Sequence, residues 1–455
     1  MKLILFSITV LVSINSFCQY KFSINGPIGG NALAYSNSSC VTAEQYNYMF
    51  KRLKQNEIYL KNSGRWGKQP TPQSTVLFQL PLKKKNGISD GGFFAISGFF
   101  DHNPVRPGAL LDYNCGDRSS DNAINHRGTD YYLFPYAWKK MRDNDVEAVA
   151  AAAGMIIGKF DGHFDECGCV WTDCNNWNAV YIKHADNTIA FYGHLKKNSL
   201  LPKGIGDTVS AGEYLGVVGS SGQSSGPHLH FEVWQNESYT QLIDPYAGPC
   251  NYINGNSSKW IQQEPYRAST LSAVRTHSDY PQMGSCPATE VMNEKNEFAN
   301  GNKVVMGSYF RDQIAGQVVI HSVIKPDGTL LGSWQQTFTD TYTAAYWLAD
   351  VYLPNPAPTG IWHYKATYNG QSDSAAFAVN ILFQYRFTGN GNYSAASNWQ
   401  NNKVPPNPVP RGIEVVIDNQ QNECIIDVPV TFQKGAKLTI SQSNKIKIPQ
   451  NLLIN

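Results

Sequence analysis

The 455-residue sequence has few long apolar runs and little net charge, and both absences exclude classes of protein. Beyond residue 18, no stretch is long and apolar enough to cross a bilayer as a helix. No basic amphipathic helix is present for binding to a membrane surface. A net charge of +2 provides no strongly basic face for nucleic acid. We therefore predict neither a membrane span in the mature chain nor nucleic acid as a partner.

The first residues have the pattern of a secretory signal peptide, which the sequence predicts over residues 1–18. The apolar run 3–12 is too short to span a bilayer. Ser16 and Cys18 place small residues at the two positions that a signal peptidase recognises. Phe17 fits a lipid-attachment site poorly, so we expect cleavage after Cys18 and a secreted protein, extracellular or periplasmic.

Export changes how the nine cysteines are interpreted. Cys18 leaves with the leader, and an even set of eight remains in an oxidising compartment, where disulfides form. The cluster at positions 167, 169 and 174 could be a thiolate zinc site, but it lacks the paired Cys-x-x-Cys spacing of such sites. We predict disulfides of undetermined connectivity. The eight residues are Cys40, Cys115, Cys167, Cys169, Cys174, Cys250, Cys286 and Cys424.

The chain is predicted to be mainly β, because short runs rich in Val, Ile, Tyr and Thr are separated by Gly, Asn and Asp throughout. Its length exceeds what one core usually serves, so we expect several domains. The N-terminal segment, residues 19–76, contains one expected helix over residues 42–61. Thr42 and Gln45 match a capping box at its start. This segment is either a support or a propeptide, and we favour a support because no processing signal stands out.

Two histidines stand in the strand-like run 225–233, Ser-Gly-Pro-His-Leu-His-Phe-Glu-Val. Side chains two apart on a strand share a face, so His228 and His230 could both point into one polar site. Histidine is the commonest metal ligand and a frequent general acid or base. An isolated pair of this kind is more often two tolerated histidines, so a functional site requires further ligands elsewhere in the chain.

A second motif is His126-Arg-Gly-Thr-Asp130. On a straight strand these two side chains would lie roughly 13 Å apart, too far to reach one ion. If both bind one metal, the chain must turn near Gly128, whereas a turn or capping aspartate is the simpler alternative. Further on, the runs 178–184 and 188–194 predict a β-hairpin that ends at His194.

A loop rich in glycine and serine, residues 219–226, precedes the two-histidine strand. It enters a strand rather than a helix and lacks the lysine of a P-loop, which argues against nucleotide binding.

Taken in order, His126-x-x-x-Asp130, Tyr192-Gly-His194-Leu and Gly-Pro-His228-Leu-His230 resemble the motifs of the lysostaphin-type zinc metallopeptidases. The resemblance covers residues 77–250, and many members of that family cut peptidoglycan cross-links. It implies a lysostaphin-like, antiparallel β catalytic domain that contains a groove.

The resemblance also implies residue roles. It makes His126, Asp130 and His230 the ligands of one zinc ion per chain, with the fourth position open for water or substrate, as in catalytic zinc sites. It makes His194 and His228 the catalytic pair that hydrogen-bonds the attacking water or the tetrahedral intermediate. No His-Glu-x-x-His motif is present, so an imidazole would do the work of the glutamate found in other zinc peptidases.

Four nearby residues have weaker claims. Tyr192 could donate to an oxyanion, but packing beside the site is an equal alternative. Simple alternation puts Glu232 on the face of His230, where a supporting hydrogen bond or a solvated strand end is favoured over ligation. His163 and His184 match no motif and are interpreted as surface or supporting residues. The insertion 161–177, with its three cysteines, is expected to wall the substrate groove.

The rest of the chain shows nothing catalytic. Residues 251–292 are interpreted as a connector. Five strand-like runs between residues 293 and 382 predict an immunoglobulin-like β-sandwich. The last segment, residues 383–455, is predicted to be a small C-terminal β-module. A structural role is favoured for it over carbohydrate or wall binding and over a role in export and anchoring.

The sequence therefore predicts a secreted zinc metalloendopeptidase that acts on peptidoglycan or, as a weaker alternative, on glycine-rich peptide. A non-catalytic wall-binding or scaffold protein on a peptidase fold is the second hypothesis. The complete set of five polar residues favours the enzyme, because a chain without catalysis would have no chemical need for them.

Overall fold

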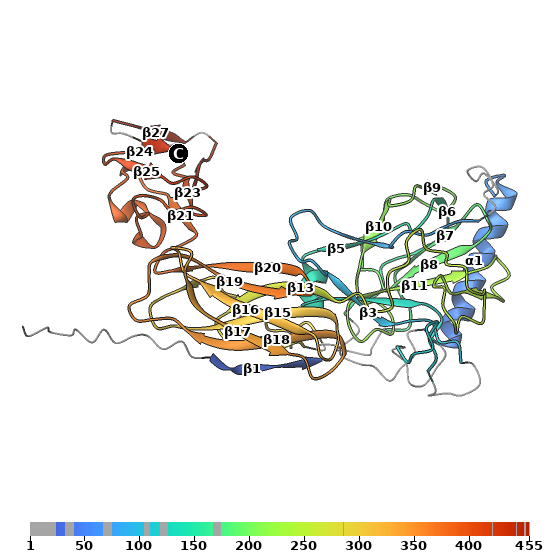
Figure 1. Ribbon diagram of the computed structural model, residues 1–455. Helices are drawn as coiled ribbons and strands as arrows, with labels where there is room; N and C mark the ends of the chain where they lie inside the picture. The colour runs from blue at the N-terminus through green and yellow to red at the C-terminus, as the bar shows by residue number, and fades with distance from the viewer. Residues whose placement is uncertain are drawn as a thin grey trace, which may run out of the picture.

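The computed structural model describes residues 24–31, 41–66, 75–103, 110–118, 126–166, 174–284, 286–420, 422–442, 444–449 and 452–454. The predicted signal peptide and three of the eight remaining cysteines (Cys40, Cys167 and Cys169) lie outside the described residues, as do residues 167–173 of the insertion 161–177. The described chain is mainly β, as expected, and forms three bodies (Figure 1). No helix in the described part is long and apolar enough to cross a membrane.

The first body, here called the site domain (residues 75–266), is built on an eight-stranded sheet. Its strand order is β3-β4-β11-β8-β7-β6-β9, with β12 paired to β11, and all these pairs are antiparallel. The bounds are β3 (Phe94–Gly98), β4 (Thr129–Leu133), β6 (Gly154–Phe160), β7 (Ala179–Lys183), β8 (Ile189–Gly193), β9 (Thr208–Val209), β11 (His228–Trp234) and β12 (Leu242–Ile243). The predicted hairpin is β7–β8, which confirms that expectation.

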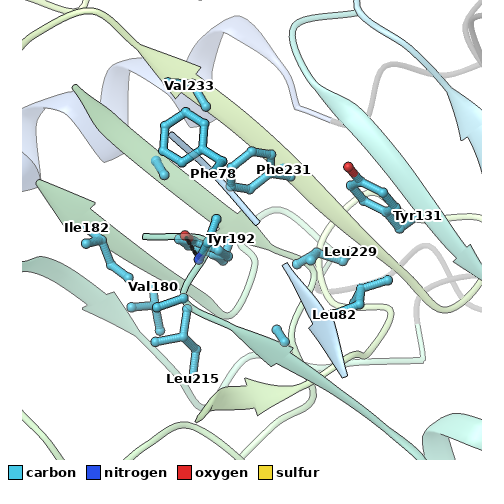
Figure 2. Packing of buried hydrophobic residues seen from close by; sticks show 14 of the residues in the cluster. Phe78, Leu82, Tyr131, Val180, Ile182, Tyr192, Leu215, Leu229, Phe231 and Val233 are labelled. Carbon is cyan, nitrogen blue, oxygen red and sulfur yellow. Dashed lines mark hydrogen bonds between the residues drawn. The ribbon is translucent and has the colours of Figure 1, made fainter. Parts of the chain in front are cut away.

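One face of this sheet packs on the main hydrophobic core. Leu229, Phe231 and Val233 alternate along β11 toward that face and are fully buried there, together with Tyr192 of β8 (Figure 2). A smaller sheet covers them, formed by β2 (Leu82–Lys84), β5 (Val146–Val149) and β10 (Tyr214–Val217). Burial of each such apolar side chain contributes roughly 1.5–3 kcal/mol. The intervening residues of β11, which include both histidines, therefore face the other side of the sheet.

The helix α1 (Ala43–Asn62) covers part of this other side (Figure 1). Thr42 is its N-cap, and the predicted capping box with Gln45 is present, with the Gln45 N–H donating to Thr42 Oγ1 at 3.2 Å and the Thr42 N–H donating to Gln45 Oε1 at 2.6 Å. The buried stripe of α1 packs on β6, β8 and β11, and its apolar members are Tyr46, Met49, Leu53 and Leu60. A second, short helix, α2 (Ala137–Arg142), follows β4.

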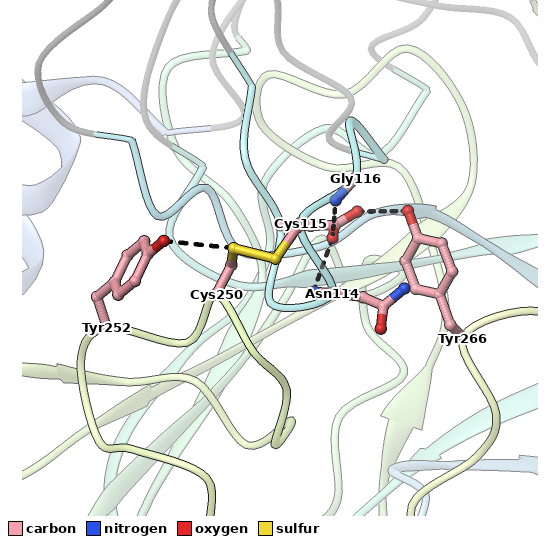
Figure 3. Close-up of a disulfide and its surroundings, with 7 residues drawn as sticks. Asn114, Cys115, Gly116, Cys250, Tyr252 and Tyr266 are labelled. Carbon is pink, nitrogen blue, oxygen red and sulfur yellow. Dashed lines mark hydrogen bonds between the residues drawn. A yellow bond between two sulfur atoms is a disulfide. The ribbon is translucent and has the colours of Figure 1, made fainter.

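A disulfide joins Cys115 to Cys250 across 135 residues of chain (Figure 3). Cys174 is also disulfide-bonded. Cys286 and Cys424 are free thiols, so the prediction of disulfides was wrong for these two. Cys424 is fully buried in the C-terminal core, where no other cysteine of its own segment is available.

The second body is a β-sandwich whose two sheets enclose one core that includes Phe310, Trp362 and Phe377. The range predicted as a connector contributes β13, and the N-terminal segment contributes β1, which pairs with β18. The immunoglobulin-like classification stays a prediction. One sheet holds β1 (Ile24–Asn31), β18 (Tyr342–Tyr352), β15 (Lys303–Gln313) and β13 (Thr270–His277). The other holds β14 (Glu297–Phe298), β20 (Gln371–Val379), β19 (Gly360–Tyr368), β16 (Val318–Ile324) and β17 (Leu330–Thr337).

The third body is a coil of short parallel strands with its own core. The chain passes through three small sheets in turn, β21-β23-β26, β22-β24-β27 and β25-β28, which is the arrangement of a β-solenoid. The bounds are β21 (Gln384–Phe387), β22 (Gly391–Asn392), the 3₁₀ helices η1 (Ala396–Asn398) and η2 (Gln400–Asn402), β23 (Glu414–Ile417), β24 (Glu423–Ile425), β25 (Val430–Phe432), β26 (Lys437–Ile440), β27 (Lys445–Lys447) and β28 (Leu452–Ile454).

A buried histidine makes the stability of the sandwich depend on pH. His321 of β16 stacks on Trp334 at 4.8 Å between ring centroids and shares a hydrogen bond of 2.9 Å with the Tyr364 hydroxyl. Burial lowers the pKa of His321 to about 4. Between pH 6.5 and about 4 the unfolded chain binds a proton that the folded chain excludes, so the free energy of unfolding falls as pH falls.

We predict that the sandwich loses up to about 3 kcal/mol through His321 between pH 7 and pH 4. The variant His321→Phe keeps a stacked ring but cannot titrate, so this part of the pH dependence should disappear. Hydrogen-exchange labelling of β16 and β19 peptides along a denaturant series measures it locally. An unaltered pH slope in His321→Phe would contradict the prediction.

Candidate functional site

The pairing register of three strands brings the predicted site residues together. In the antiparallel pair β4–β11, Asp130 lies directly opposite His230. In the pair β11–β8, Gly193 lies opposite His230 on its other side. Directly opposed residues on antiparallel strands share a face at close range. The carboxylate of β4 and the end of β8 therefore meet the histidine face of β11.

The chain turns at Gly128, which brings His126 back to Asp130. His126 Nε2 lies 3.1 Å from Asp130 Oδ2, so the expectation of a turn at this glycine is confirmed. A side chain at Gly128 would not fit, because its Cβ would lie 2.5 Å from the Phe231 carbonyl oxygen and 2.9 Å from His230 Nε2. Glycine is thus required by the close approach of this turn to β11.

His194 reaches the site through an unusual backbone conformation. By alternation along β8, Gly193 faces the site and Tyr192 faces the core, which would also point the next residue toward the core. The strand ends at Gly193, and His194 adopts a φ of 60°. This left-handed conformation redirects the side chain, and its ring centroid lies 4.3 Å from that of His228. Such strain is typical of functional positions.

The donor atoms of His126, Asp130 and His230 all lie within 4.8 Å of one another. His230 Nδ1 is 2.8 Å from Asp130 Oδ1, and its Nε2 is 3.1 Å from Glu232 Oε2. Nε2 donates a proton to Glu232 and Nδ1 donates one to Asp130, so the two carboxylates hold this imidazole in its protonated form. All three side chains are almost completely buried. Two imidazoles and a carboxylate at this spacing match the donor set of a divalent zinc or similar ion.

Backbone carbonyls fix the tautomer of the other imidazoles. The Nδ1 atom of His126 lies 2.8 Å from the Phe99 oxygen, and that of His228 lies 2.8 Å from the Gly226 oxygen. In the same way, His194 Nδ1 lies 2.5 Å from the oxygen of Ser221. Since each Nδ1–H donates to a carbonyl, each Nε2 presents a lone pair to the site.

The Nε2 atoms of His194 and His228 are buried and have no hydrogen-bond partner among the described residues. A buried polar atom without a partner is costly, unless something binds there. These two atoms flank the three-residue donor set, which fits a site that receives a metal ion and a polar substrate group.

Burial and mutual proximity tune the charges of the cluster. Burial alone would raise the pKa of the Asp130 carboxyl, but the surrounding imidazoles outweigh it and hold that pKa well below its usual value. Burial, together with the neighbouring imidazoles, holds the pKa of His194 well below its usual value, and burial also lowers the pKa of His228. Burial opposes charge on His230, but its hydrogen bonds to Asp130 and Glu232 raise its pKa to about 10. At neutral pH the site therefore contains the Asp130 carboxylate, the protonated imidazole of His230 and the two neutral imidazoles of His194 and His228.

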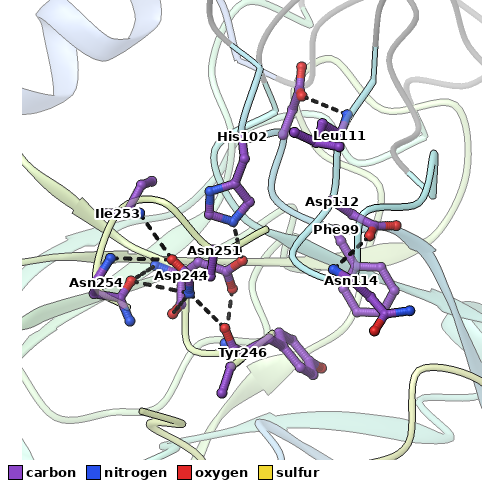
Figure 4. Close-up of polar contacts among 12 residues, drawn as sticks. Phe99, His102, Leu111, Asp112, Asn114, Asp244, Tyr246, Asn251, Ile253 and Asn254 are labelled. Carbon is purple, nitrogen blue, oxygen red and sulfur yellow. Dashed lines mark hydrogen bonds and ion pairs between the residues drawn. The ribbon is translucent and has the colours of Figure 1, made fainter. Parts of the chain in front are cut away.

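The loop after β3 supports His126. Phe99 accepts the His126 ring proton, and the Asp101 N–H donates to the His126 carbonyl oxygen at 2.9 Å. The next residue, His102, is anchored by a fully buried contact of 2.8 Å between its Nε2 and Asp244 Oδ2 (Figure 4). This anchor ties the loop after β3 to the segment after β12.

Three of the weaker sequence claims are resolved by position. Tyr192 lies in the core on the opposite face of the sheet, where its hydroxyl accepts from the Ala151 N–H at 2.8 Å, so the oxyanion role is wrong. His184 is buried against Phe78, away from the site. Glu232 is buried and hydrogen-bonded to His230, rather than at a solvated strand end.

Several residues at the site belong to none of the three sequence motifs. Trp177 packs against both His194 and His230, with centroids 4.9 and 5.6 Å away. It also fills the space above Gly193, where a Cβ would lie 2.3 Å from the indole. Ser221 holds His194 through its carbonyl oxygen.

Comparison with known proteins adds to this geometry. The sequence model described as peptidase family M23 matches residues 140–245. The chain contains a domain of peptidase family M23. The match includes His194, His228 and His230, whereas His126 and Asp130 lie just before it and are joined to the M23 motifs by the fold. The resemblance to lysostaphin-type peptidases is confirmed.

Three curated relatives are similar to part of the chain. Over 68 residues, 15% of this chain and 16% of the relative, identity is 47% with an uncharacterized metalloprotease of Buchnera aphidicola. Over 55 residues, 12% of each chain, identity is 47% with a DD-carboxypeptidase/endopeptidase of Neisseria meningitidis. Over 141 residues, 30% of this chain and 33% of the relative, identity is 36% with a glycyl-glycine endopeptidase of Staphylococcus capitis. The alignments therefore span at most a third of these relatives.

Similarity to solved structures is low over the whole chain. The C-terminal domain of wzt aligns with 26% of this chain and 81% of its own, at 9% identity and a TM-score of 0.18, and supports no inference.

The geometry of the M23 domain predicts that Asp130 is essential for metal binding. The variant Asp130→Asn replaces the carboxylate between the two imidazoles with a neutral amide, so zinc affinity should fall by at least about 100-fold. Competition with a chromophoric chelator measures the dissociation constant. Asp143→Asn, the same change at the exposed end of α2, should bind zinc as the unmodified protein does. Equal affinity in Asp130→Asn would contradict the assignment.

Proposed function

We propose that this protein is a zinc metalloendopeptidase that hydrolyses peptide bonds in bacterial peptidoglycan cross-links. The observation that carries the proposal is the buried cluster of His126, Asp130 and His230, whose donor atoms lie within 4.8 Å of one another. Beside it lie two imidazoles whose Nε2 atoms have no hydrogen-bond partner among the described residues. The M23 match and the peptidase names of the relatives support the same reaction class.

The three donors would hold one zinc ion through His126 Nε2, an Asp130 oxygen and His230 Nδ1. When bound, zinc lowers the pKa of its water and polarises the scissile carbonyl. The chain keeps the site ready for such an ion, because carbonyl and carboxylate acceptors orient every imidazole before binding. The proton that leaves His230 on binding makes metal affinity depend on pH.

His194 and His228 would perform the proton transfers. Their pKa values are lowered mainly by burial, so both imidazoles are neutral at neutral pH and can accept a proton. One Nε2 takes the proton of the attacking water, and the protonated ring later returns a proton to the leaving amine. The ring that stays neutral can hold the water in place, since the two centroids are 4.3 Å apart.

The names of the relatives support the proposed substrate class. One is named as a DD-carboxypeptidase/endopeptidase, another as a peptidoglycan DD-endopeptidase of Vibrio cholerae, and a third as a glycyl-glycine endopeptidase. We propose a peptide cross-link as the bond that this chain cleaves, with a glycine-rich peptide as the weaker alternative. A substrate outside the cytoplasm agrees with the predicted signal peptide and with the disulfide between Cys115 and Cys250.

We predict that the purified protein releases peptide fragments from peptidoglycan in a chelator-sensitive reaction. His194→Gln and His228→Gln should each keep one zinc per chain but lower the turnover number by about 100-fold or more, because each removes a proton-transfer group. Mass spectrometry of the released fragments, from walls with direct and with glycine-bridged cross-links, identifies the bond.

Two outcomes would contradict this function. Absence of zinc from the folded protein would contradict the assignment of the metal site. Full activity in both variants would contradict the catalytic role of His194 and His228. Tight binding to peptidoglycan without release of fragments would favour the non-catalytic wall-binding alternative. His363→Gln, on β19 of the β-sandwich, is the control and should retain full activity.

A further inference from the structure

Glu232 has a buried carboxylate that the proposed reaction does not use. Its side chain is fully buried, and no lysine or arginine among the described residues forms an ion pair with it. Three donors satisfy it instead: Tyr46 Oη donates to Oε2 at 2.6 Å, His230 Nε2 donates to the same oxygen at 3.1 Å, and Trp234 Nε1 donates to Oε1. Burying a carboxylate is costly, so a cluster of this kind calls for an explanation.

The Glu232 carboxylate holds one ring nitrogen of His230 and leaves the other directed toward the proposed metal site. Nε2 is held by Glu232 and Nδ1 faces Asp130, so the ring can neither flip nor change tautomer without losing a hydrogen bond. A carboxylate behind a ligating imidazole orients it and increases its basicity. The alternation of β11 puts Glu232 in this place, two residues beyond His230 on the same face.

Tyr46 extends this contact to a helix far away in the sequence. It lies on the buried stripe of α1, 186 residues before Glu232 and outside the range matched by the M23 family. The Arg127 guanidinium lies over the Tyr46 ring at 4.3 Å from its centroid. Since Arg127 directly follows His126, one tyrosine contacts the segments of two of the three proposed zinc ligands.

We propose that Tyr46 and Glu232 are positioning residues of the metal site, and that α1 thereby forms part of it. The hydrogen bond from Tyr46 fixes the carboxylate, and the carboxylate fixes His230 with Nδ1 toward the metal. This inference rests on the proposed zinc site. It adds that the M23 domain holds its metal at full affinity only while α1 is docked on the sheet.

A purely structural role would also explain a buried tyrosine–glutamate contact, since it joins α1 to β11. The two roles differ in what they change. A structural contact stabilises the folded chain equally with and without zinc, so its loss leaves the zinc dissociation constant of the folded protein unchanged. A positioning contact changes the dissociation constant itself, and with it the stabilisation that added zinc provides.

The test measures zinc affinity of the full chain at constant pH by competition with a chromophoric chelator. Glu232→Gln should weaken binding about 10- to 100-fold, the usual effect of losing a carboxylate behind a ligand histidine. Tyr46→Phe removes one oxygen and keeps the ring under Arg127, so it should weaken binding about threefold to tenfold. The double variant should bind no more weakly than Glu232→Gln alone, because Tyr46 acts through Glu232.

Two further measurements make the result specific. Tyr59→Phe is the matched control, because Tyr59 is on α1 but 59% exposed, and its affinity should equal that of the unmodified protein. The absorption spectrum of the cobalt-substituted protein should shift in Tyr46→Phe, since the orientation of a ligand ring affects it. If Glu232→Gln fails to fold, Tyr46→Phe alone decides the test.

Failure of this inference is distinct from failure of the proposed function. If the unmodified protein binds one zinc and Tyr46→Phe matches it within twofold with the same cobalt spectrum, Tyr46 has only a structural role and the inference is overturned. If the unmodified protein binds no zinc, the proposed function is overturned together with it.

Discussion

The site depends on the pairing register of β4, β11 and β8. With Asp130 opposite His230, and Gly193 opposite His230 on the other side, three strands deliver a carboxylate and imidazoles to one face of one sheet. A shift of one residue in either pair would send these side chains into the apolar core. The buried residues on the opposite face, such as Leu229 and Phe231, make that shift costly, so the packing of the core specifies the geometry of the site.

The sequence predicted this site well where spacing alone carries the information. Alternation along residues 228–232 correctly gave the shared face of His228, His230 and Glu232, and the metal hypothesis correctly required a turn at Gly128. The alternation rule gave the wrong side of the sheet for the residue that follows the end of β8. Tyr192 and His194 are two apart, but the left-handed backbone at His194 puts them on opposite sides of the sheet, and no local pattern announces that conformation. Tyr46 lies within the helix expected over residues 42–61, but its contact with Glu232 depends on tertiary packing.

The same division holds for the rest of the fold. The capping box at Thr42 and the hairpin β7–β8 depend on neighbouring residues and were predicted within a residue or two. The strand β1 joins the sandwich through β18, more than 300 residues later, and such pairing leaves no trace in local sequence. The free thiol of Cys424 could have been predicted from the sequence, because its segment contains no second cysteine.

The disulfide between Cys115 and Cys250 encloses every strand from β4 to β12 in a single covalent ring. A protease that cuts a surface loop inside this ring converts the chain into two pieces that stay joined, and the strand pairs that carry the histidines keep their partners. The whole range matched by the M23 family, residues 140–245, lies inside the ring. A nicked molecule therefore keeps the residues of its site together.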